Sequence, residues 1–282
     1  MNNWRVGWAT AIAWIWSMGF GWGATNATPQ VTHPLDFRVI ERATRDGISL
    51  FVASEFNLEF TVTLDLVLTN AVASCPLPLT VDSAGRKSFE LLNLHPKNPG
   101  LWKYSYTFYC QPGARRASRS NDAVYQLPYQ LEQAHRVLQG NLGKFSHAAG
   151  SRNEYAVDWA AAPGTTICAA RAGMVTGVRQ DFTLGGPEEK YKAAANYVII
   201  KHPDGTFAEY YHLQAKGALV QLGQKVSTGQ AIALSGNTGF SARPHIHMAV
   251  FQNVDGKDRM TLPTRFRTSQ GLMTDLEQGE RY

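Results

Sequence analysis

The chain has 282 residues, which is enough for two domains. Its formal net charge of +5 is modest and suits an anionic partner. Lysine and arginine are scattered, with one tight cluster at Arg115, Arg116 and Arg119, and no recognition motif accompanies them, so we expect no nucleic acid among the partners.

The first 27 residues are predicted to be a secretory signal peptide. Arg5 precedes an uncharged apolar stretch from Val6 to about Ala24, and residues 25–27 form a small-residue cleavage site. A retained membrane anchor is the alternative, because the stretch is about as long as the roughly 18 residues needed to span a bilayer. Its glycines, its few leucines and the cleavage site favour removal. We therefore expect an exported protein, in the periplasm or outside the cell, with no membrane contact after signal removal.

Residues 28–112 are predicted to form a small β-sandwich of immunoglobulin or fibronectin type. Apolar and polar residues alternate in short runs such as Phe60–Leu66 and Trp102–Tyr109, and turn residues such as Asp82–Gly85 separate them. His33 and His95 are isolated, so no chemistry is expected in this domain.

Residues 113–140 are assigned as a linker because the stretch from about Gln111 to Asp122 is polar and rich in arginine. Within it, Tyr129–Leu138 is either a short helix or an extended strand. The second domain, residues 141–282, shows strands, glycine-rich turns and almost no helical periodicity, which predicts an antiparallel β-sheet. The fold class is therefore all-β.

The chain has three cysteines, and an exported chain meets oxidising conditions. We predict a Cys75–Cys110 disulfide, which would stabilise the fold by about 3 to 4 kcal/mol on the chain-entropy model. Cys168 is predicted to be a free, small apolar core residue.

The most informative segment is Pro244–Phe251, which reads as a strand with His245 and His247 on one face and its apolar residues on the other. Histidine is the commonest metal ligand, and a catalytic zinc site uses three protein ligands and leaves one position for water. Because the chain has eight histidines, the pair alone is a weak indicator.

Two further segments supply donors. Asp158 lies between the small residues Ala156 and Ala160, which leaves room for an ion, although an aspartate that caps the following turn is the alternative. In Phe207–Leu213 a second strand carries Tyr210 and His212 on one face, and by itself His212 reads as a structural histidine.

The run from Gly143 to Phe251 resembles the lysostaphin and LytM-type zinc metallopeptidases, which cut peptidoglycan cross-bridges. The matching pieces, in order, are Ser146-His147, Tyr155-Ala156-Val157-Asp158, Pro163-Gly164-Thr165, Ala169 to Val175, Asn196 to His202, Tyr210-Tyr211-His212-Leu213, Gly223 to Val226 with Gly229-Gln230, Ser235 to Gly239, and Pro244 to His247. The resemblance implies a LytM-type (duplicated hybrid motif-like) peptidase domain.

By this resemblance one Zn²⁺ per chain is expected on His147, Asp158 and His247, with His212 and His245 as the catalytic histidines. The implied activity is hydrolysis of peptide stems or cross-bridges of peptidoglycan, and the expected partners are peptidoglycan and proteins of the cell-wall machinery. The zinc ligands do not identify the bond, because the shape of the groove chooses between a glycine bridge and a D-Ala to diamino-acid link.

Two other classes stay open at this point. A degenerate, non-catalytic LytM-like protein would bind the wall and activate a separate amidase, but such proteins lose site positions that are all filled here. A cupin-like metal oxygenase would need a glutamate soon after the histidine pair, and Met248–Phe251 offers none.

The chain departs from the family in its first motif. Ten residues separate His147 from Asp158 where the family usually has three, and the position four before Asp158 is Glu154, a rival ligand. We expect His147 to be the ligand, because on an extended strand Glu154 lies about 13 Å from Asp158.

Overall fold

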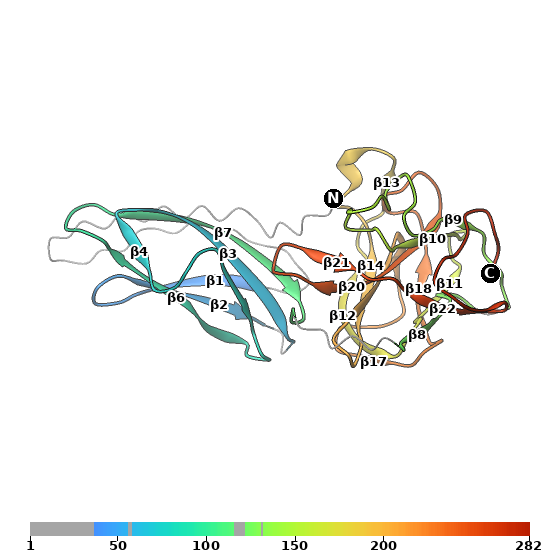
Figure 1. Ribbon diagram of the computed structural model, residues 1–282, viewed down its shortest axis with the longest axis horizontal. Coiled ribbons are helices and arrows are strands. Elements are labelled where there is room, and N and C mark those ends of the chain that lie inside the picture. The colour runs from blue at the N-terminus through green and yellow to red at the C-terminus, as the bar shows by residue number, and fades with distance from the viewer. Residues whose placement is uncertain (1–36, 56–57, 116–121, 131) are drawn as a thin grey trace. The chain divides into compact units, whose positions relative to one another are not determined.

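The computed structural model describes residues 37–282 except 56–57, 116–121 and 131 (Figure 1). The predicted signal peptide, residues 1–27, lies outside the described residues. The described chain divides into two compact units: residues up to Ala114 together with Asp255–Lys257, and Arg115–Val254 together with Asp258–Tyr282. The described residues include no helix that is long and apolar enough to cross a membrane.

The N-terminal unit has a four-stranded sheet, in the order β1-β2-β6-β4, and a three-stranded sheet, in the order β5-β3-β7. Every pairing is antiparallel. The strands are β1 Phe37–Ala43, β2 Ile48–Ser54, β3 Phe60–Thr69, β4 Ala71–Ala73, β5 Leu79–Asp82, β6 Ser88–Pro96 and β7 Lys103–Pro112.

The apolar faces of these two sheets meet. The ring centroid of Phe60 in β3 lies 4.8 Å from that of Phe37 in β1 and 6.0 Å from that of Phe89 in β6. Alternate residues of β7 are buried, as period-two patterning requires of a strand with one face on a core. The predicted β-sandwich is therefore confirmed.

All three cysteines are free, so the predicted Cys75–Cys110 disulfide is wrong. Cys110 is buried in β7 of the three-stranded sheet, whereas Cys75 is half-buried and follows β4 of the four-stranded sheet. The pairing failed because spacing along the chain does not reveal which sheet each segment joins. Cys168 is free and buried in the core of the other unit, as expected.

The second unit is built on an eight-stranded antiparallel sheet, in the order β17-β12-β14-β15-β20-β10-β9, with β21 paired to β20. Its strands are β9 Val137–Gln139, β10 Val157–Ala160, β12 Gly173–Arg179, β14 Tyr197–Lys201, β15 Phe207–Tyr211, β17 Lys225–Val226, β20 His245–Asn253 and β21 Arg259–Thr261.

Three small sheets and one 3₁₀ turn complete this unit (Figure 1). Their elements are β11 Thr166–Cys168, β16 Leu213–Ala218 and β18 Ala231–Ser235; β13 Gly185–Gly186 and β19 Gly239–Phe240; β8 Val124–Gln126, β22 Arg265–Thr268 and β23 Gly271–Met273; and η1 Glu189–Tyr191. The predicted all-β class is confirmed.

Part of the stretch assigned as a linker contributes to these sheets. β8 pairs in parallel with β22, and β9 pairs antiparallel with β10. Where the sequence left a helix or a strand open for Tyr129–Leu138, the structure has strand β9 at its end and no helix in the described residues of that segment.

The core of this unit explains the positions of the site residues. Val157 and Trp159 of β10 and Ile246 and Met248 of β20 are all buried in one apolar cluster. The residues between them, Asp158 and His247 among them, therefore face the opposite side of the sheet.

Candidate metal centre and active site

Asp158 and His247 are held side by side by the pairing of β10 with β20. They are direct register partners, and Asp158 Oδ1 is 2.8 Å from His247 Nδ1. β15 flanks β20 on its other side and brings Tyr211 opposite His247. The site therefore sits over the middle of the large sheet, where three strands fix its geometry.

His147 reaches the same point from the loop between β9 and β10. Its side chain is fully buried, and its Nε2 lies 3.5 Å from Asp158 Oδ2. One donor atom from each of His147, Asp158 and His247 lies within 4.8 Å of the other two. The structure thus brings together the three residues that were expected to hold a metal.

Glu154, the rival ligand, is not in this group. Its carboxylate accepts a hydrogen bond from the backbone N–H of Gly150, 3.0 Å away, and its own backbone carbonyl accepts one from Leu142. Glu154 therefore stabilises the loop that carries His147.

Gln139 is a site residue that the sequence did not reveal. Its side-chain oxygen accepts hydrogen bonds from the backbone N–H groups of Phe145 and Ser146, and its amide nitrogen lies 2.9 Å from Ser146 Oγ and 3.4 Å from Asp158 Oδ2. This side chain fastens the loop of His147 to the strand of Asp158. Its only signal in the sequence is a polar residue just before the Gly140–Gly143 turn.

Hydrogen bonds determine which nitrogen of each ligand histidine faces the centre. His147 Nδ1 donates to the carbonyl oxygen of Gly140 at 3.0 Å, because a carbonyl only accepts, and this leaves the buried Nε2 without a hydrogen-bond partner. His247 presents Nδ1 to Asp158 and turns Nε2 toward Glu209 Oε1, 3.6 Å away. His147 therefore directs its Nε2 toward Asp158, whereas His247 directs its Nδ1 there.

The charges at this centre are strongly coupled. Burial opposes ionisation of Asp158, but the contact with His147 and the hydrogen bond from His247 outweigh it and hold the pKa of the carboxyl well below its usual range. Burial likewise opposes protonation of His247, yet Asp158 and Glu209 raise its pKa to about 9. A metal ligand must be a neutral imidazole, so metal binding here displaces a proton.

Glu209 is a second residue that the sequence analysis missed. It is fully buried in β15 and forms a two-pronged ion pair with Arg259 of β21. Burial disfavours its charge, but Arg259 and His247 overcome this and lower the pKa of Glu209 to about 2. A charged residue between Ala208 and Tyr210 in an otherwise apolar strand was the available signal.

Alternation along one strand had predicted that His212 and Tyr210 share a face, and this prediction is wrong. Tyr210 is buried in the core, whereas His212 follows the end of β15 in a left-handed conformation, with φ of 64°. Such a φ is uncommon outside glycine and here turns the imidazole to the metal side of the sheet. Its ring centroid lies 4.4 Å from that of His245.

Both of these histidines are held in the neutral form. Nδ1 of His212 donates to the carbonyl of Thr238 at 2.8 Å, and Nδ1 of His245 lies 2.8 Å from the carbonyl of Arg243, so each Nε2 keeps its lone pair. Burial and the neighbouring His245 and His247 lower the pKa of His212 to about 3, and burial also lowers the pKa of His245. His245 Nε2 lies 3.9 Å from Asp158 Oδ1, beside the cluster.

The donor set fits zinc. Two imidazole nitrogens and one carboxylate oxygen are donors that zinc prefers, and three protein ligands leave one tetrahedral position open. The unpartnered Nε2 of His147, buried and directed at Asp158, is a further sign that this group is arranged around an ion.

Comparison with known proteins agrees with this geometry. Residues 152–259 match the model of peptidase family M23. The second unit contains an M23 metallopeptidase domain. The matched segment includes Asp158, His212, His245 and His247 and begins after His147, which the structure places beside Asp158 and His247 as the sequence analysis expected.

The relatives of this M23 domain include peptidoglycan enzymes. The chain is 39% identical over 90 residues to the peptidoglycan DD-endopeptidase ShyA of Vibrio cholerae, which is 32% of this chain and 18% of that protein. It is 33% identical over 122 residues to an uncharacterised metalloprotease of Haemophilus influenzae, 43% of this chain and 23% of that protein. The chain thus spans only about a fifth of the length of these relatives.

Among solved structures, the catalytic domain of lysostaphin from Staphylococcus simulans is 20% identical, with 47% of this chain and 94% of that chain covered and a TM-score of 0.32. The likeness of this chain to LytM-type metallopeptidases rests on the family match and the sequence relatives. Zinc is the metal that M23 metallopeptidases use, and the residues of this site suit it.

Proposed function

We propose that this protein is a zinc-dependent endopeptidase that hydrolyses peptide cross-links of bacterial peptidoglycan in the cell envelope or outside the cell. The observation that carries the proposal is the cluster of His147, Asp158 and His247 with two neutral histidines beside it. The names of the relatives from Vibrio cholerae support peptidoglycan as the substrate.

His147 Nε2, an oxygen of Asp158 and His247 Nδ1 would hold the metal. Zinc bound there supplies polarisation of the scissile carbonyl and a lower pKa for the attacking water. The Nε2 atoms of His212 and His245 orient that water and accept its proton. As the water oxygen bonds to the carbonyl carbon and the C–N bond breaks, the proton passes to the departing amine; such acid–base help is worth about 10² to 10⁴ in rate.

Digestion of purified peptidoglycan tests the proposal. The zinc-loaded chain should release new amino termini from cross-linked wall, a chelator should stop the reaction, and added zinc should restore it. His245→Ala is the matched control, since it removes a catalytic group and leaves all three metal ligands.

An intact, zinc-loaded protein that leaves cross-links whole but stimulates a separate amidase would refute the peptidase and support the activator. Mass analysis of the released fragments identifies the bond that is cut.

A further inference from the structure

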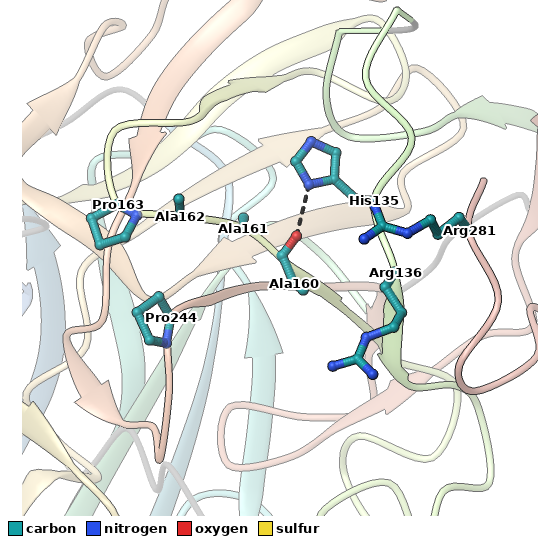
Figure 2. Close-up of a pocket in the computed structure, with 8 residues that line it drawn as sticks. All are labelled: His135, Arg136, Ala160, Ala161, Ala162, Pro163, Pro244 and Arg281. Carbon is teal, nitrogen blue, oxygen red and sulfur yellow. Dashed lines mark hydrogen bonds between the residues drawn. The ribbon is translucent and has the colours of Figure 1, made fainter.

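A pocket of about 600 Å³ lies at the end of β10 that follows Asp158. Figure 2 shows Ala162, Pro163 and Pro244 on one side of it, His135, Arg136 and Arg281 on the other, and Ala160 between them, with its carbonyl oxygen hydrogen-bonded to His135. Ala160 follows Asp158 by two residues on the same strand, so it lies about 7 Å farther along the same face. Pro244 directly precedes His245. The pocket therefore borders the candidate active site at His245.

Strand register places two arginines in one row with a catalytic histidine. His245 pairs with Ala160, the backbone N–H of Ala160 donates to the carbonyl of Arg136 at 2.8 Å, and Arg136 forms a β-bridge with Arg281. Residues opposite each other on neighbouring strands share a face of the sheet. Val137, which follows Arg136, is buried in the core, so Arg136 lies on the metal side.

The two guanidinium groups are not neutralised by the protein. Arg136 and Arg281 form no ion pair with any described carboxylate, and the one hydrogen bond recorded for the Arg281 side chain is to the backbone carbonyl of Ala134, at 3.0 Å. Like charges at directly opposed positions repel each other. Because the side chain of Ala160 is small, it leaves open space beside Arg136 and Arg281 on the side toward His245. Both arginines are exposed and line the pocket, so an anion held there can pair with their guanidinium groups.

We propose that Arg136 and Arg281 bind a free carboxylate of the peptide substrate next to the scissile bond. The inference rests on the proposed function and specifies its substrate class. The preferred cross-link is one whose amine is donated by a residue that carries a carboxylate on the same carbon, as diaminopimelate does. A glycine bridge has no such group and leaves both guanidinium groups unpaired.

The dimensions of the sheet agree with this assignment. Neighbouring strands are about 4.8 Å apart, so the backbone of Arg136 lies about 10 Å from that of His245, with Ala160 between them. An arginine side chain reaches back over most of this distance. One residue of an extended peptide spans about 3.5 Å, so a carboxylate one residue from the bond at His245 lies within reach of the Arg136 side chain, and Arg281 lies one strand beyond Arg136.

Binding is measured first. The probes are a cross-linked muropeptide dimer with its diaminopimelate carboxylate free and the same dimer with that group converted to a carboxamide. By titration calorimetry with full-length, zinc-loaded His245→Ala protein, which should not turn the probes over, we expect the carboxylate dimer to bind about tenfold more tightly. Adding Arg136→Gln and Arg281→Gln together should remove the preference, whereas adding Arg267→Gln, an exposed arginine on β22, should leave it.

Each result decides the proposal. Equal binding of the two dimers, or a preference that survives both arginine replacements, overturns it. If Arg281→Gln disturbs folding because its bond to Ala134 is lost, Arg136→Gln alone should still reduce the preference several-fold.

Cleavage is measured separately on the unsubstituted protein with the free-carboxylate, carboxamide and pentaglycine-bridged dimers. A protein that binds with the expected preference but cuts none of the three refutes hydrolysis and leaves the carboxylate site standing. A protein that cuts all three at equal kcat/KM refutes the carboxylate site and leaves hydrolysis standing.

Discussion

Glu209 lies against the side of His247 that faces away from Asp158, with 3.6 Å between Glu209 Oε1 and His247 Nε2. Asp158 occupies the other ring nitrogen at 2.8 Å. Carboxylates that accept a hydrogen bond from the outer nitrogen of a ligand histidine fix its tautomer and orientation and strengthen it as a ligand. Arg259 keeps this carboxylate charged although it is buried.

Glu209→Gln should therefore weaken zinc binding about 10- to 100-fold, since the neutral amide orients His247 less strongly. Competition with a chromophoric chelator measures the affinity. The change also leaves Arg259 buried without a counter-charge, which is expected to lower the free energy of unfolding by about 3 to 5 kcal/mol.

The double variant Glu209→Gln/Arg259→Gln separates the two effects. It should recover much of the stability but not the zinc affinity. Wild-type affinity in Glu209→Gln would show that Glu209 acts on folding alone.

Six alanine variants separate metal ligands from catalytic groups. His147→Ala, Asp158→Ala and His247→Ala should each lose zinc and activity, because one of three protein ligands is gone. His212→Ala and His245→Ala should keep about one zinc per chain and lose about 10² to 10⁴ in rate. Metal content and peptidoglycan turnover are measured together.

Glu154→Ala is the sixth variant and serves as the control. Its carboxylate bonds within the loop, so zinc content should stay near that of the wild type. Zinc retained in His147→Ala but lost in Glu154→Ala would reverse the assignment of the first ligand.

His202 should make the fold sensitive to acid. It is buried away from the metal cluster, and burial lowers its pKa to about 4 from an ordinary 6.5. Between these two values the unfolded chain binds more protons than the folded chain, so stability falls as pH falls from about 6.5 to about 4. The loss amounts to about 2 to 3 kcal/mol.

His202→Asn is the matched variant, because its side-chain amide can still donate to the carbonyl of Ala172 that His202 Nδ1 contacts at 2.9 Å. Urea unfolding at pH 7 and pH 4.5 should show a smaller loss of stability for the variant. Identical losses in the two proteins would count against His202 as a source of acid sensitivity.

The cysteines should react as three separate thiols. In the native protein Cys75 should take up a thiol reagent, because it is only half-buried, whereas Cys110 and Cys168 are buried and should react after denaturation. Intact mass without reduction counts the labels. A chain that takes up a single label in denaturant would contain a disulfide and contradict the structure.

The sequence by itself determined the all-β class and most of the centre. In β10 and β20 the apolar residues recur at every second position, so Trp159 and Ile246 had to face a core and Asp158 and His247 had to face away from it. Local patterning is sufficient there because each strand fixes its own alternation.

Only the tertiary structure decided the remaining positions. His212 leaves the alternation through a left-handed backbone, and His147 reaches Asp158 because Gln139 holds their connecting loop. Both depend on contacts with other parts of the chain that a single strand's pattern does not contain.

The same holds for the pairs that surround the centre. Glu209 meets Arg259 across 50 residues of chain, and Arg136 meets Arg281 across a still longer separation. Alternation tells which face of a strand a residue lies on, but the residue opposite it depends on strand order and register, which are set when the whole sheet packs on its core.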